Sequence, residues 1–338
     1  MKRDSINRKL NKIPTHIIII IILIIWIVPT LGLFITSFRP ISLINTTGWW
    51  TFLSVDESKG DTDSSADGQT AEENTSYSEK LSERLTIDNY IDAIVGYRGT
   101  NTYREDCAAG KQSIDLKCNV SDIINPRGMG RAFVNSLIVT IPSTILPILF
   151  ALFAGYAFAW LDFKGRYLLF AILVGLQVVP LQMTLVPILR MYAKVGLTGS
   201  FLGVWLFHTG FGMPYAIYLM RNYMGGLPRD LFEAAYLDGA SHWTAFTKLV
   251  IPLCMPAVAS LAIFQFLWVW NDLLVSLVFL GGTTPVMTYQ ISNMVTSLGA
   301  GWHLLTAAAF LSMILPMIVF FALQKYFVRG MLAGAVKG

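Results

Sequence analysis

Long apolar runs separated by short polar segments dominate this sequence. A helix needs about 20 apolar residues to cross roughly 30 Å of hydrocarbon. Six runs qualify, near residues 15–38, 133–161, 167–192, 198–220, 251–280 and 305–327. Pro180 and Pro187 predict a kink or a break in the third run. The runs are too long and continuous for barrel strands, so the pattern predicts an all-α membrane protein with six transmembrane helices.

Composition supports a membrane protein and narrows its chemistry. Hydrophobic residues make up 54% of the chain and charged residues only 14%, and the mean hydropathy is +0.56. The four histidines are scattered and no Cys or His pair has ligand spacing, so no metal site is expected. HExxH, GxSxG and GxxxxGK[ST] motifs are all missing from the sequence. We therefore expect no catalytic residues, no cofactor in this chain and no nucleic-acid partner.

Lysine and arginine predict the orientation of the chain in the membrane. With residues 1–14 in the cytoplasm and 15–38 as the first span, thirteen of these residues fall in cytoplasmic segments. The short external segments hold only Arg190 and Lys194, and the segment 281–304 holds neither residue type. This asymmetry follows the positive-inside rule. It predicts that both termini and the segment 221–250 face the cytoplasm.

Residues 39–130 form a long predicted extracytoplasmic loop of different composition. Its part 56–83 is rich in Ser, Thr, Asp, Glu and Gly and cannot bury enough apolar surface to fold alone. Residues 85–97 carry apolar and aromatic residues at helix-like spacing. Cys107 and Cys118 lie on the oxidising side, and the sequence leaves open whether they form a disulfide. The loop is either a docking site for an external binding protein or a tolerated insertion.

The polar segment 221–250, between the fourth and fifth runs, has residues that suit two short helices. Pro228 fits a first helical turn, and Gly239 can end that helix in a left-handed conformation. Ser241 can cap a second helix that leads through Lys248 to Pro252. A compact apolar face is expected on the first helix, from Leu231, Ala234, Ala235 and Leu237. The segment is therefore predicted to be a stiff lever joined to the fifth span.

Six residues of this lever resemble the EAA signature of ABC-importer permeases, and segment 221–250 is called the EAA loop below. They are Glu233, Ala234, Ala235, Asp238, Gly239 and Pro252. Further likeness lies in Asn135-Ser136-Leu137, in Trp270-Asn271-Asp272 and in the tail Gly334-Ala335-Val336-Lys337-Gly338. Residues 131–338 and the first span resemble a carbohydrate-uptake permease of the type of the smaller membrane subunit of the maltose importer. The tail is also similar to that of α-glucoside permeases.

This resemblance implies a type I ABC importer permease fold with the EAA loop and a cytoplasmic tail, 328–338, that contact an ATPase. The implied partners are a homologous permease, a cytoplasmic ATPase dimer that binds ATP and Mg, and an extracytoplasmic sugar-binding protein. The resemblance also implies contact with the sugar and with membrane lipid. The implied location is the bacterial inner membrane, and the implied substrate is an oligosaccharide or an α-glucoside.

Asp272 is the one acidic residue inside a predicted span, where a buried acid costs roughly 2.5–3.5 kcal/mol on insertion scales. With Gln265, Trp268 and Asn271 it could line a translocation path. Equally, it could make a structural hydrogen bond between helices near the outer end of its span. The sequence leaves both interpretations open.

A second functional class is a secondary transporter or channel that works alone. Such proteins usually carry several intramembrane charges, broken helices or inverted repeats. This chain has one intramembrane Asp and no evident repeat. The sequence therefore favours an ATP-driven importer subunit over a stand-alone transporter.

Overall fold

The computed structural model describes residues 13–53, 84–95, 128–294 and 301–335, with side chains described as far as Tyr326. These residues form helices and turns without a strand, as the sequence predicted. They belong to two compact units, one of residues 1–122 with 294–311 and the other of residues 123–293 with 312–338. Residues 1–12, Cys107, Cys118 and the last three tail residues lie outside the described part of the chain.

The first unit contains the first predicted span and the described parts of the external segment that precede α7. Its helices are α2 (Ile13–Ser37), α3 (Ile41–Ile44), η1 (Trp49–Leu53), α5 (Asp88–Val95) and the start of α16 (Trp302–Ala335). Helix α2 leaves the side chains from Ile17 to Val28 exposed, as expected where lipid replaces protein contacts. The helix expected within 85–97 is present as α5.

Asn89 fastens α5 to the end of α2. Its amide nitrogen donates to the carbonyl oxygens of Ser37 at 2.9 Å and Arg39 at 2.8 Å. The hydroxyl groups of Ser37 and Tyr90 are 2.7 Å apart. The Arg39 guanidinium is buried and donates to the carbonyl oxygens of Leu43 and Thr47. Asn89 thus satisfies the last carbonyl group of α2, and Arg39 satisfies carbonyl groups of the segment that follows it.

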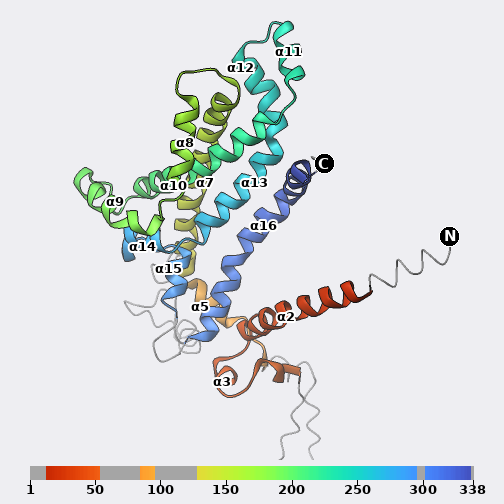
Figure 1. The fold of residues 1–338 in the computed structure, drawn as a ribbon. Helices are drawn as coiled ribbons and strands as arrows, with labels where there is room; N and C mark the ends of the chain where they lie inside the picture. The colour runs from red at the N-terminus through yellow and green to blue at the C-terminus, as the bar shows by residue number, and fades with distance from the viewer. Residues whose placement is uncertain (1–12, 54–83, 96–127, 295–300, 336–338) are drawn as a thin grey trace, which may run out of the picture. The chain divides into compact units, whose positions relative to one another are not determined.

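The second unit is a bundle built around two long helices, α7 (Met129–Trp160) and α10 (Phe201–Gly225). Helices α8 (Arg166–Leu176) and α9 (Leu181–Val195) connect them. The EAA loop contributes α11 (Arg229–Leu237), α12 (His242–Ala245) and the π-helical turn η3 (Phe246–Val250). The chain continues through α13 (Ile251–Trp270), α14 (Leu274–Leu280), η4 (Gly281–Thr283) and α15 (Met287–Ser292). Within this unit, α11 and α12 lie at the opposite end from α14 and α15 (Figure 1).

Four described helices are long and apolar enough to cross a membrane: Pro14–Ser37, Met129–Trp160, His242–Trp270 and Trp302–Tyr326. Helices α8 and α9 would make a fifth span, but they meet at 99°. The break falls at Pro180, which precedes α9, so the predicted break is confirmed. Helix α10 has 25 residues but is less apolar, because its buried face carries polar residues such as His208 and Thr209. The count of six spans stays a prediction.

The fifth predicted span, 251–280, is wrong as a continuous helix. Helix α13 ends at Trp270, and a separate helix, α14, begins at Leu274. Asp272 therefore lies in the short break between two helices and not inside one. Apolarity alone does not mark this break, because the run is apolar on both sides of Asn271 and Asp272, the polar pair at which it falls.

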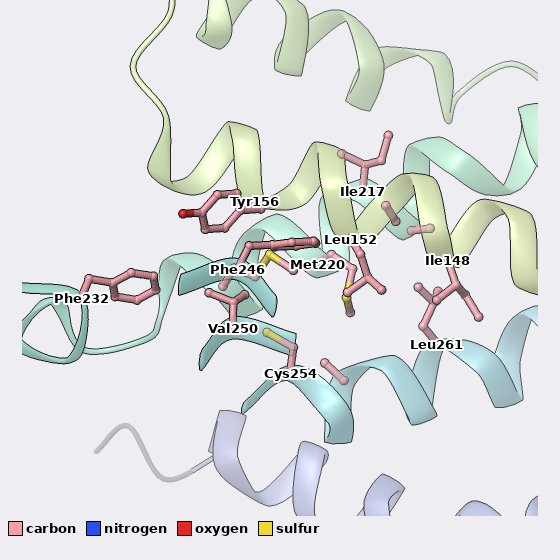
Figure 2. Close-up of a cluster of buried hydrophobic side chains, with 14 residues drawn as sticks. Ile148, Leu152, Tyr156, Ile217, Met220, Phe232, Phe246, Val250, Cys254 and Leu261 are labelled. Atoms are coloured by element: carbon pink, nitrogen blue, oxygen red, sulfur yellow. The ribbon is translucent and has the colours of Figure 1, made fainter. Parts of the chain in front are cut away.

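Close packing of α7 against α10 forms the main core of the bundle (Figure 2). Leu152 and Tyr156 of α7, Met220 of α10 and Leu261 of α13 meet in this core. Gly155 makes the close approach possible, because a Cβ atom there would lie 2.8 Å from the Met220 Cβ and 3.1 Å from the Arg221 backbone nitrogen. The two helix backbones are therefore in near contact at Gly155.

We predict that Gly155→Ala destabilises the purified chain by about 1–3 kcal/mol, the usual cost of overpacking a core. Gly175→Ala is the matched control, because Gly175 also lies in a helix but nothing lies within 4 Å of a Cβ there. Removing that helical glycine should leave stability unchanged or raise it slightly. Thermal unfolding in detergent, followed by size-exclusion chromatography, measures both. Equal midpoints for the two variants would contradict the near contact of α7 and α10.

Candidate functional site

The EAA loop folds as two short helices at a sharp corner, as its residues predicted. Helix α11 begins after Pro228 and ends at Leu237, and Gly239 adopts a left-handed φ of 81°. The backbone nitrogen of Ala240 donates to the carbonyl oxygen of Ala235 at 2.9 Å, which closes the end of α11. The Ser241 hydroxyl then caps α12 by accepting from the Thr244 backbone nitrogen at 3.2 Å. The corner is thus fixed by local bonds.

Phe232 anchors α11 to the bundle. Its ring is 2% exposed and stacks on Trp160, at the end of α7, with ring centroids 3.7 Å apart. The Trp160 indole nitrogen donates to the Met224 carbonyl oxygen near the end of α10 at 3.1 Å. One aromatic contact therefore joins the EAA helix to the ends of both central helices.

The compact apolar face expected from Leu231, Ala234, Ala235 and Leu237 is not packed in this chain. Leu237 is 89% exposed, and Leu231, Glu233 and Ala234 are exposed as well. The residue that docks α11 on the bundle is instead Phe232. The face around Leu237 is left uncovered, with Glu233 beside it.

A polar cluster ties both helices of the EAA loop to α7. The Tyr236 hydroxyl lies 2.9 Å from Nδ1 of His242, and the Tyr156 hydroxyl lies 3.4 Å from the same nitrogen. The two tyrosine hydroxyl groups are 3.5 Å apart. Tyr156 also packs its ring against Phe246 of the π-helical turn. The cluster adds a second link between the loop and the bundle.

Helix α12, the π-helical turn η3 and α13 form one uninterrupted helical rod, His242–Trp270. Within it, Phe246, Val250 and Cys254 are buried in the same core as Met220 and Leu261 (Figure 2). Pro252 falls at the second residue of α13, within this rod, and donates no backbone hydrogen bond to the π-helical turn before it. The rod therefore joins the EAA loop directly to the core of the bundle.

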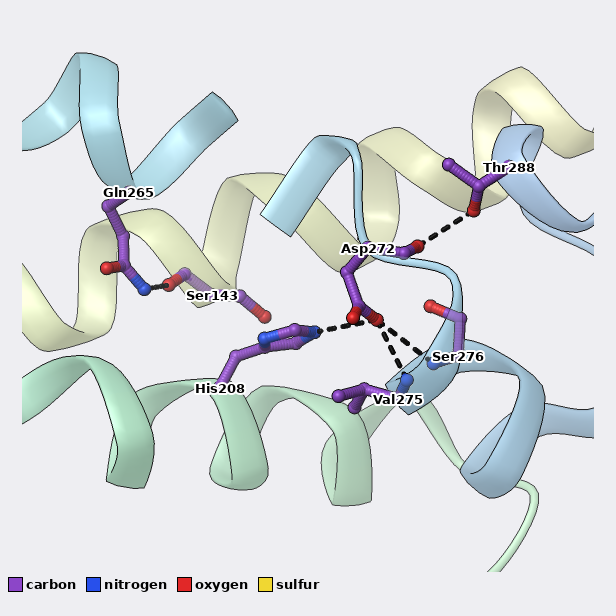
Figure 3. A network of polar contacts seen from close by, with 7 residues as sticks. All are labelled: Ser143, His208, Gln265, Asp272, Val275, Ser276 and Thr288. Atoms are coloured by element: carbon purple, nitrogen blue, oxygen red, sulfur yellow. Dashed lines mark hydrogen bonds and ion pairs between the residues drawn. The ribbon is translucent and has the colours of Figure 1, made fainter. Parts of the chain in front are cut away.

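Asp272 acts as a helix cap at the other end of the rod. One carboxylate oxygen, Oδ2, accepts from the backbone nitrogens of Val275 at 3.0 Å and Ser276 at 3.3 Å, at the start of α14 (Figure 3). The same oxygen lies 3.9 Å from Nε2 of the fully buried His208. The Thr288 hydroxyl of α15 donates to the Asp272 carbonyl oxygen at 2.8 Å. These contacts favour the structural interpretation of Asp272.

Asn135, Ser136 and Trp270, which belong to the other motifs that carry the family resemblance, also make hydrogen bonds at this end of the bundle. The Asn135 amide nitrogen donates to the Pro285 carbonyl oxygen at 2.8 Å, and the Ser136 hydroxyl accepts from the Met287 backbone nitrogen at 2.8 Å. The Trp270 indole donates to the Ser312 carbonyl oxygen at 3.0 Å. Side chains of α7 therefore hold the start of α15, and Trp270 ties the end of α13 to α16.

The structure divides the four candidate path residues into two pairs. Gln265 and Trp268 line one groove between α10 and α13. Asn271 is exposed and donates to the Leu267 carbonyl oxygen of its own helix at 2.8 Å, and Asp272 caps α14. Neither residue of this second pair is among the residues that line the groove.

Sequence reasoning missed Phe232, Trp160 and His208 as parts of these sites. Neither Phe232, next to Glu233, nor Trp160, at the end of the second span, is unusual in the sequence. Their role is visible only from their contact in the folded chain. His208 lies in a run with Gly210 and Gly212, and glycines within a span signal close helix approach. Gly334 and Ala335 fall in the last turn of α16, and their side chains lie outside the described part.

Among the described residues, no three His, Cys, Asp or Glu side chains gather as metal ligands. The candidate site thus consists of three parts: the exposed helix α11 with Glu233, the helical rod His242–Trp270 behind it, and the aromatic groove beside that rod. This arrangement suits a mechanical role.

A comparison with protein families matches residues 132–333 to the family described as "Binding-protein-dependent transport system inner membrane component". The match covers more than half of the chain, and the chain belongs to this family. It is accordingly a multi-pass permease of the inner membrane and a non-catalytic component of its transport system.

Two relatives align over nearly the whole chain. The osmoprotective compounds uptake permease protein GgtD of Synechocystis sp. is 49% identical, over 99% of this chain and 97% of the relative. The alpha-glucoside transport system permease protein AglG of Rhizobium meliloti is 42% identical, over 96% of each chain. A solved chain of a bacterial ABC transporter involved in alginate import shares the fold, with a TM-score of 0.61 and 17% identity. It covers 95% of this chain and 98% of its own length.

We predict that Asp272→Ala destabilises the purified chain, because the first backbone N–H groups of α14 lose their acceptor. Loss of such a cap typically costs about 1 kcal/mol. Asp272→Asn keeps a side-chain oxygen that can accept these bonds and should remain close to the wild type in thermal stability and in uptake. If Asp272→Asn abolishes uptake while stability is retained, the carboxylate has a role in transport and the capping account is insufficient.

Proposed function

We propose that this chain is the permease subunit of an ATP-driven importer of sugars, with α-glucosides or related glycosides as substrates. The observation that carries the proposal is the EAA loop: an exposed helix, α11, fixed through Phe232 and a continuous helical rod to the core of the bundle. The substrate class is supported by the name of the relative AglG, an alpha-glucoside permease that aligns over nearly the whole chain.

The proposed complex contains a homologous permease, a cytoplasmic ATPase dimer that binds ATP and Mg, and an extracytoplasmic sugar-binding protein. The family description, which names a binding-protein-dependent system, supports the last of these partners. Glu233, Leu237 and Gly239 would seat α11 in a cleft of one ATPase subunit. The tail 334–338, which includes Lys337, would reach the ATPase dimer interface.

In this proposal, ATP binding closes the ATPase dimer and moves α11, and the rod transmits that movement to the permease core. The two conformations of the permease then face opposite sides of the membrane. ATP can drive the change only if the closed ATPase dimer stabilises one conformation more than the other. The stiffness of the link matters, because a flexible loop would absorb the movement before it reached α13.

The orientation that we propose has both termini and the EAA loop in the cytoplasm. The lysine and arginine distribution supports it. Helices α14 and α15, which lie at the opposite end of the bundle from α11, would then face the outside (Figure 1). Membership of a binding-protein-dependent family favours this importer over the stand-alone transporter or channel.

We predict that Glu233→Arg and Gly239→Asp each remove most of the ATPase that co-purifies with the tagged chain. The first reverses a charge on the exposed face of α11, and the second puts a side chain at a φ of 81°, which only glycine adopts at low cost. The measurement is a pull-down from native membranes in mild detergent, with identification of all co-purifying proteins. The second permease should remain bound in both variants.

Lys164→Glu is the control, because it reverses an exposed charge in the loop between α7 and α8 without touching α11. It should keep the ATPase at the wild-type level. Recovery of the wild-type chain alone, with neither an ATPase nor a second permease, would contradict the proposal and would favour the stand-alone transporter.

We also predict the side of the membrane from which two positions can be labelled. Leu237 is 89% exposed and Trp50 is 68% exposed. Each cysteine is introduced into a variant without native cysteines and treated with a membrane-impermeant maleimide. A cysteine at position 237 should react only in preparations that expose the cytoplasmic face, such as inside-out vesicles. A cysteine at position 50 should react in intact cells or spheroplasts. The reverse pattern would overturn the proposed orientation.

A further inference from the structure

A groove of about 350 Å³ lies between α10 and α13, on the bundle formed by the second unit. Four aromatic rings and one amide dominate its lining, which consists of Phe211, Gly212, Tyr215, Leu261, Phe264, Gln265 and Trp268. The rings of Tyr215, Phe264 and Trp268 are each between 38% and 48% exposed. None of the seven lining residues is charged. The volume falls within the range of about 300–1,000 Å³ that is typical of small-molecule sites.

Gln265 is held in a fixed position at this groove. It is 5% exposed, and its amide nitrogen donates to the Ser143 carbonyl oxygen of α7 at 3.2 Å (Figure 3). Gly212 leaves room for the amide, because a Cβ atom there would lie 2.6 Å from Nε2 and 2.9 Å from Oε1 of Gln265. A buried amide held in this way presents hydrogen-bonding groups to a ligand at little cost of ordering.

Trp268 is supported from behind by His208. The fully buried imidazole meets the indole edge to face, with centroids 5.2 Å apart at 90°. Within the described part of the chain, neither ring nitrogen of His208 makes a hydrogen bond, and the same holds for the buried hydroxyls of Ser143 and Thr209. His208 Nε2 lies 3.9 Å from Asp272 Oδ2, and these buried polar atoms are shielded from solvent, so the groups offered to a ligand are those of the lining residues themselves.

We propose that this groove is a sugar-binding subsite of the translocation path, in which a neutral pyranose ring stacks on Trp268 and Tyr215 and bonds to Gln265. This inference rests on the proposed function and adds that this subunit itself contacts the sugar. The apolar C–H face of a pyranose matches an aromatic ring, and its hydroxyl groups match an amide. The lack of charge in the lining favours a neutral ligand over an acidic sugar. A lipid chain or a helix of the partner permease would be the competing occupants.

The test uses the complete importer in proteoliposomes, with partner permease, ATPase and an excess of binding protein. Uptake of radiolabelled maltose, sucrose and trehalose is measured together with ATP hydrolysis for Trp268→Leu and Trp268→Phe. Trp268→Leu should lower the sugar transported per ATP by about tenfold, because the stacking face is lost. Trp268→Phe should keep most of the transport, because the aromatic face remains.

Phe150→Leu is the matched control, because Phe150 is an aromatic residue of α7 that is 52% exposed and does not line the groove. It should transport as the wild type does. Equal transport per ATP by Trp268→Leu and the wild type would overturn the subsite and point to lipid in the groove. Loss of the partner permease from Trp268→Leu would overturn it too, because the groove would then be a subunit interface. If the wild type takes up none of the three sugars, the proposed substrate class fails before the subsite is tested.

Discussion

The stacking of Phe232 on Trp160 is the contact on which the rest of this structure depends for its function. It presses an otherwise exposed helix, α11, against the ends of α7 and α10. Without that contact, only the polar cluster of Tyr156, Tyr236 and His242 and the corner at Gly239 would hold α11 to the bundle. With it, α11 and the rod His242–Trp270 form one lever whose far part is buried in the bundle core. A force applied to the uncovered face around Leu237 then has a direct path into the membrane.

The two ends of the bundle are built on different physical principles. Apolar and aromatic packing holds the EAA end, where Phe246 and Tyr156 join the core. Side-chain hydrogen bonds to backbone groups hold the opposite end, through Asn135, Ser136 and Asp272. Such bonds are needed where a helix breaks at membrane depth, because freed backbone groups find no water in lipid. The broken fifth span therefore explains three polar residues that have no evident place in an apolar sequence.

Sequence alone could predict the all-α class, the break at Pro180, the left-handed Gly239 and the Ser241 cap, because each depends on a local rule. It could not predict the break after Trp270, because both halves of that run are equally apolar. Nor could it find the anchor Phe232, since a contact with a residue 72 positions away leaves no periodic signal. The apolar face predicted on α11 is uncovered in this chain, and apolar residues at helical spacing do not reveal whether the chain itself or a partner covers them.

We propose that the uncovered face of α11 receives an ATPase. Photo-cross-linking from a benzophenone amino acid at Leu237, in native membranes, tests it most directly. We expect a covalent adduct with an ATPase subunit, and none from the same probe at Leu206, which is exposed on α10. An adduct with lipid alone at Leu237, or equal ATPase adducts from both positions, would contradict the claim.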